Sequence, residues 1–126
     1  MAEAGEELSR ARATLVAAEL ADKPAERYLM AHHAVGQVAA VALRTRDTRA
    51  RPPRRNVWEL VSQVAPELTE WAGYFHALQG KRQAIQAGVT SIVSGREADD
   101  LIRDGYAFAG LVEQRLVRTR RRAGQG

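Results

Sequence analysis

The chain has 126 residues, of which 45% are apolar, and a formal net charge of +4. This length supports one domain and leaves no room for a second. The sequence contains no cysteine, which excludes disulfides, thiol catalysis and cysteine-based metal centres. No apolar run approaches the roughly 18–20 residues of a membrane span, and the acidic first residues do not resemble a signal peptide, so we expect a cytoplasmic protein without membrane contact.

Arginine is concentrated in two segments. Residues 44–55 hold six arginines and one aspartate, and residues 115–122 hold five arginines, so the rest of the chain is acidic overall. Arginines in such a segment can contact phosphate with a salt-sensitive, sequence-independent affinity. The alternative is that the two segments are a solvated linker and a solubilising tail. The predicted nucleic-acid-binding residues are Arg44, Arg46, Arg49, Arg51, Arg54 and Arg55.

The first predicted helix follows a frayed terminus over residues 1–6 and ends near Ala21. Its apolar residues recur at three-four spacing: Leu8, Ala11, Leu15 and Ala18. Pro24 cannot continue this helix but suits the first turn of the next one, with Asp22 as its cap. The short link predicts that these two helices lie antiparallel.

The second predicted helix, residues 24–44, is apolar around most of its circumference. One stripe at three-four spacing comprises Tyr28, Ala31, Val35, Val38, Ala39 and Ala42. A helix that is apolar over more than half of its surface is packed on several sides. We therefore predict that it is the central helix of the domain.

Residues 45–55 form a predicted loop because they combine like charges with a pair of prolines. The spacing of Asn56 and Glu59 predicts a helix start, and the apolar period continues to residue 79 with a bend or restart at Pro66 and a stop at Gly80. A short helical turn over 81–87 and an extended connection over 89–93 follow.

The last predicted helix begins at the capping box of Ser94 and Glu97 and continues to residue 116. Gly105 and Gly110 lie inside this helix, where glycine permits close packing of helices. We predict disorder from Thr119 onward. The expected fold class is all-α, an antiparallel bundle of four to five helices with one domain over residues 1–118 and a basic tail over 119–126.

Arg27 and His32 on the central helix are the candidate catalytic residues. A guanidinium can hold a phosphate while an imidazole moves protons near neutral pH, which suits RNA cleavage by its own 2′-hydroxyl without a metal. Five residues turn a helix by about 140°, so the two side chains converge only through arginine's length, a helix irregularity or a second subunit. The alternative is that His32 is a partly buried histidine holding a hydrogen bond and Arg27 pairs with an acid.

No metal or cofactor site is predicted. His32 and His33 diverge by about 100° on a helix, and His76 alone does not complete a ligand set. The sequence also lacks a glycine-rich phosphate loop.

Three segments of the chain are informative together: DKPAERYLMAHHAVGQVAAVAL, RRNVWELVSQVAPELTEWAGYF and SGREADDLIRDGYAFAGLV. They resemble the conserved blocks of a small stand-alone HEPN family (higher eukaryotes and prokaryotes nucleotide-binding domain) of actinobacterial type. The resemblance implies a compact all-helical bundle that commonly dimerises. Many members of the superfamily are metal-independent endoribonucleases in toxin, phage-defence or RNA-processing roles.

The superfamily's signature is an arginine followed after four to six residues by a histidine. Arg27 and His32 meet it, with His33 as the alternative histidine. In the ribonuclease members the signature usually belongs to a later helix, which corresponds here to residues 94–116, and these contain no histidine. Two functions remain open. One is an RNA- or nucleotide-binding homodimer with metal-independent endoribonuclease activity, and the other is a non-catalytic module that binds nucleic acid or a protein partner.

Overall fold

The computed structural model describes residues 2–44 and 56–125. Within these residues the chain forms α1 (Ala2–Leu20), α2 (Pro24–Leu43), α3 (Val57–Val64), η1 (Pro66–Leu68), α4 (Thr69–Ala77), α5 (Gln79–Gln86), η2 (Thr90–Ile92) and α6 (Gly95–Gln125), where η marks a short 3-10 turn. The same residues contain no strand. The predicted all-α helical bundle is confirmed.

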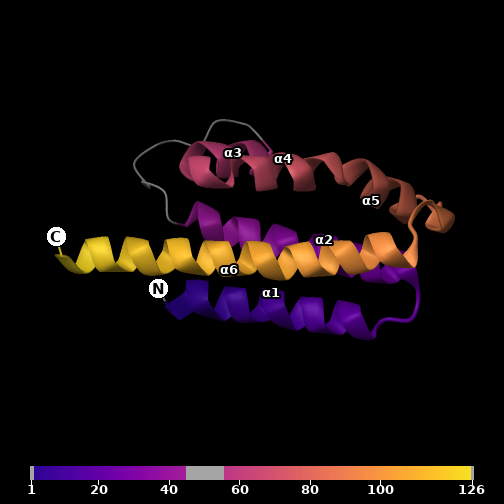
Figure 1. Cartoon of the computed structure of the whole chain (residues 1–126), viewed down its shortest axis with the longest axis horizontal. Coiled ribbons are helices and arrows are strands. Elements are labelled where there is room, and N and C mark those ends of the chain that lie inside the picture. The colour runs from indigo at the N-terminus through magenta and orange to yellow at the C-terminus, as the bar shows by residue number, and fades with distance from the viewer. Residues whose placement is uncertain (1, 45–55, 126) are drawn as a thin grey trace.

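Three long helices, α1, α2 and α6, lie side by side, and the shorter α3, α4 and α5 cover another side of α2 (Figure 1). Helix α2 packs against α1, α3, α5 and α6, which confirms its predicted central position. As the short link predicts, α1 and α2 are antiparallel. The arm formed by α4 and α5 returns the chain to the end where α2 begins, so α6 runs in the same direction as α2 (Figure 1).

Aromatic side chains join the covering arm to the long helices. Phe75 of α4 is fully buried, with its ring centroid 5.4 Å from that of Trp58 of α3 and 5.0 Å from that of Phe108 of α6. Trp71 packs beside the same two phenylalanines. This aromatic cluster fixes α3 and α4 against α6 and places α5 over α2.

The predicted helix starts at Asn56 and Ser94 are confirmed. The Asn56 side chain accepts a hydrogen bond from the Glu59 amide at 3.0 Å. The Ser94 hydroxyl accepts from the Glu97 amide at 3.1 Å, and the Glu97 carboxylate accepts from the Ser94 amide at 3.4 Å. Both N-terminal caps provide acceptors for backbone N–H groups that have no partner within the helix.

Several predicted boundaries are wrong. Helix α1 begins at Ala2 instead of after residue 6, because Ala4 and Leu8 pack into the core. The N-cap of α2 is Lys23 and not Asp22, and its side chain makes no capping bond. The chain does restart at Pro66, but Gly80 lies inside α5 and the connection after it holds the turn η2.

The predicted disorder from Thr119 is also wrong, because α6 continues to Gln125. Leu116 packs into the core, and Arg115 donates a hydrogen bond to the Val64 carbonyl, so the helix is held where the tail was expected to begin. Arginine and glutamine are good helix formers, and no proline interrupts the segment.

Gly105 and Gly110 provide a stability test because the two positions on α6 differ in space. A Cβ at Gly105 would lie 2.8 Å from a methyl carbon of the fully buried Leu15, whereas a Cβ at Gly110 meets nothing within 4 Å. We expect Gly110→Ala to stabilise the protein by about 1 kcal/mol, because alanine has the higher helix propensity. Gly105→Ala should have the same gain in helix propensity, but overpacking against Leu15 should cost about 1–3 kcal/mol. Urea unfolding of both variants measures the difference. Equal stabilisation by the two substitutions would contradict the close approach of α6 to α1.

Candidate functional site

Arg27 and His32 leave α2 in different directions. The Arg27 guanidinium forms an ion pair with Asp99 of α6. His32 faces α5 and lines a cavity to which Arg27 does not contribute. The structure therefore does not bring these two predicted catalytic residues together within one chain, as the 140° rotation between them indicates.

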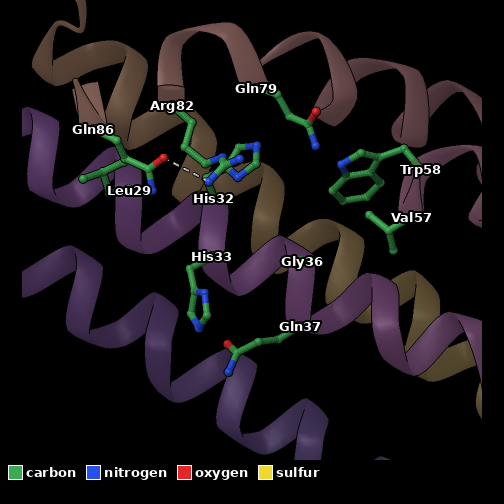
Figure 2. A pocket seen from close by; sticks show the side chains of 10 residues that line it. All are labelled: Leu29, His32, His33, Gly36, Gln37, Val57, Trp58, Gln79, Arg82 and Gln86. Carbon is green, nitrogen blue, oxygen red and sulfur yellow. Dashed lines mark hydrogen bonds between the residues drawn. The ribbon is translucent and has the colours of Figure 1, made fainter. Parts of the chain in front are cut away.

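The His32 cavity has a volume of about 440 Å³ and lies between α2, the start of α3 and α5 (Figure 2). Its lining combines apolar side chains with amide, imidazole and guanidinium groups. The lining residues are Leu29, His32, His33, Gly36, Gln37, Val57, Trp58, Gln79, Arg82 and Gln86. The volume falls within the range of small-molecule sites in proteins.

His32 is the one buried polar or charged residue among those that the structure describes, with 6% of its surface exposed. Its imidazole hydrogen-bonds the backbone of Phe75, and its Nε2 atom is buried without a hydrogen-bond partner. Burial lowers the pKa of His32 to about 4, and the positive charge of Arg82 adds to this shift, while the Phe75 bond opposes it. The ring is therefore neutral at pH 7.

Arg82 extends from α5 toward His32 and lies beside Gln86 (Figure 2). Its Nη1 atom donates to the Gln86 side-chain oxygen at 3.3 Å, and its Nε atom is buried without a partner. Within residues 2–44 and 56–125, no carboxylate forms an ion pair with Arg82, whereas the adjacent Lys81 pairs with Glu97. A partly buried guanidinium without a counter-charge is unfavourable until an anion completes it.

Arg82 is not among the site residues predicted from the sequence. The sequence pattern that could have indicated Arg82 is the spacing of Gln79, Arg82 and Gln86, which places three polar side chains on one face of a helix. That spacing does not identify α2 as the neighbour of α5, so it could not connect Arg82 with His32.

The predicted nucleic-acid-binding arginines are described only in part. Arg44 is exposed and forms ion pairs with Glu3 and Glu7 of α1. The other predicted arginines, Arg46, Arg49, Arg51, Arg54 and Arg55, lie outside the described residues.

Two features are absent from the described part of the chain. It contains no cluster of three or more histidine or acidic side chains arranged to hold a metal ion. None of its helices combines the length and apolar character needed to cross a bilayer.

Comparison with known protein families identifies the family of this chain. The family model described as SAV_6107-like HEPN matches residues 18–113, which is more than half of the chain and includes His32, Arg82 and most of the core. No curated protein and no solved structure matches the chain. The chain therefore belongs to the SAV_6107-like HEPN family.

Proposed function

We propose that this HEPN protein binds RNA or a nucleotide, with a phosphate group of the ligand held by Arg82 in the His32 cavity. The observation that carries the proposal is the partly buried Arg82 guanidinium, which has no carboxylate partner among the described residues. Guanidinium donors match phosphate oxygens in a forked geometry, and the resulting charge-assisted bonds are about twice as strong as neutral ones.

The other cavity residues add hydrogen-bonding groups to the positive charge of Arg82. His32 is neutral at pH 7, so Arg82 supplies the positive charge beside it. The Gln86 side chain accepts a hydrogen bond from the Arg82 guanidinium, and the Gln79 amide lies nearer to Trp58 (Figure 2). Amides can both donate to and accept from the polar edges of a base.

Metal-independent RNA cleavage is the second candidate function. It is favoured by the unpartnered Nε2 atom of His32, because the Phe75 bond engages the other ring nitrogen and leaves this one as an acceptor. Nε2 would take the proton of the 2′-hydroxyl as its oxygen attacks phosphorus, while Arg82 stabilises the charge on the phosphate. The 5′-oxygen would leave with a proton from water, giving a 2′,3′-cyclic phosphate and a 5′-hydroxyl. The alternative phosphate ligand, Arg27, requires the second subunit of the predicted homodimer.

Binding of a fluorescent single-stranded RNA in chelator tests the first proposal. We expect Arg82→Gln to weaken binding about tenfold or more, since a charge-assisted bond contributes about 1.5–3 kcal/mol and each 1.4 kcal/mol is a factor of ten. The matched control is Arg96→Gln, which removes the same charge from an exposed position at the start of α6. Equal losses in the two variants would contradict a specific role for Arg82.

The same mixtures of protein and RNA can be analysed for RNA cleavage products. The catalytic candidate requires product from the wild type and loss of that product in His32→Ala, with thermal unfolding showing that the variant is folded. Binding without product would leave the non-catalytic module. Absence of both RNA and nucleotide binding would favour the protein-interaction alternative.

A further inference from the structure

A second cationic site lies at the C-terminal end of α6, on a different part of the molecule from His32. From Gln114 to the end of the chain there are five arginines and no acid. A cavity of about 480 Å³ lies between these last turns of α6 and the turn η1. Its lining residues are Glu67, Arg115, Arg118, Thr119 and Arg122.

The single acid in this cavity, Glu67, is held by the arginines around it. Arg115 donates from Nη1 to Glu67 Oε2 at 2.7 Å and from Nη2 to the Val64 carbonyl at 2.8 Å. Arg118 Nη2 lies 3.5 Å from the same carboxylate oxygen. Burial opposes ionisation, yet a backbone hydrogen bond and the bond from Arg115 lower the pKa of Glu67 below its ordinary value.

We propose that this cavity binds a phosphate group of an RNA strand, and that the Glu67 carboxylate occupies the position of a phosphate oxygen until RNA displaces it. Carboxylate and phosphate oxygens accept the same forked donors from arginine, so the geometry built around Glu67 serves either anion. The choice of RNA rests on the proposed function, but none of the residues is shared with the His32 cavity.

The exposure of the site favours this exchange. The side chains of Glu67 and Arg118 are 44% and 54% exposed, so their ion pair is screened by water and contributes little. Arg122 also lines the cavity, and Arg121 is exposed beside it. A strand that contacts several of these arginines would release counterions at each contact, which the tethered carboxylate cannot do.

An anionic membrane fits this surface less well than RNA. A helix that lies in a membrane surface needs an apolar stripe beside its cationic one. Over the last turns of α6, Leu116 is buried in the bundle and Val117 is the one large apolar residue that is exposed. The segment therefore offers charge without a surface for insertion.

Glu67→Gln tests the displacement directly, because glutamine keeps an acceptor for Arg115 while removing the competing charge. We expect it to tighten binding of single-stranded RNA about twofold to tenfold. The control is Glu70→Gln, an exposed glutamate of α4 that forms no ion pair among the described residues and gives the same change in net charge. Equal tightening by both variants, or weakening by Glu67→Gln, would overturn the proposal.

Arg118→Gln with Arg122→Gln gives a second readout that does not depend on the Glu67 variant folding. We expect this pair to reduce the slope of log affinity against log salt by about 1.4 for single-stranded RNA. The control pair, Arg96→Gln with Arg103→Gln, removes the same charge from the other end of α6 and should leave the slope nearly unchanged. Equal slopes in the two pairs would contradict the site.

Two further experiments distinguish this site from its alternatives. Repeating the Glu67 and Glu70 comparison in Arg82→Gln protein shows whether the effect survives when the His32 cavity is disabled, as independent sites require. Binding to vesicles that contain phosphatidylserine tests the membrane alternative. Binding to vesicles that depends on Arg118 and Arg122, without such dependence for RNA, would replace RNA by a lipid surface and overturn the proposal.

Discussion

Phe75→Ala is expected to lower the free energy of unfolding by about 3–5 kcal/mol. Phe75 is fully buried, and its ring lies 5.0–5.9 Å from the rings of Trp58, Trp71 and Phe108. Removing it leaves a cavity where α3, α4 and α6 meet. Because whole domains are stable by only about 5–15 kcal/mol, this change alone should leave the protein close to unfolding.

Urea unfolding followed by circular dichroism measures the effect of Phe75→Ala. The neighbouring Tyr74→Phe is the control, since Tyr74 is partly exposed and loses only its 2.7 Å hydrogen bond to Asp104. We expect the control to cost about 1 kcal/mol or less. Similar losses in the two variants would contradict the aromatic cluster as the junction of the arm with the long helices.

Acidification is expected to destabilise the protein through His32. The pKa of this histidine is about 4 in the folded protein and about 6.5 in the unfolded chain, so the unfolded state binds more protons between these values. Stability therefore falls as pH drops from about 6.5 to about 4. The shift corresponds to a loss of about 3 kcal/mol below pH 4.

The difference between wild type and His32→Gln isolates this effect from the titration of carboxylates. Urea unfolding at several pH values between 7 and 4 should give a steeper decline for the wild type than for His32→Gln. His76→Gln is the control, because His76 is exposed on α4. Parallel curves for wild type and His32→Gln would show that His32 is not held neutral by burial.

Local patterns in the sequence predicted much of the fold. The caps at Asn56 and Ser94 depend on partners three residues away, so their signals are complete within four residues. The central position of α2 follows from its apolar surface, which must be covered on several sides. Disorder after Thr119 was predicted wrongly because the support for that part of α6 comes from Val64 and Glu67, which are distant in the sequence.

The candidate site depends on such distant contacts. His32 and Arg82 are 50 residues apart, and only the packing of α5 on α2 places them in one cavity. The alternative considered for Arg27 and His32, an ion pair with an acid and a buried histidine with a hydrogen bond, agrees with their observed contacts. The sequence pattern identified His32 as a residue of interest but could not identify its neighbours.

The most direct test of phosphate binding by Arg82 is the NMR titration of His32 with and without single-stranded RNA, with the exposed His76 as the control. A phosphate beside Arg82 would offset the positive charge that contributes to lowering the pKa of His32. We therefore predict that saturating RNA raises the pKa of His32 in the wild type. Saturating RNA that leaves the titration of His32 unchanged would contradict the proposal that the ligand's phosphate lies in this cavity.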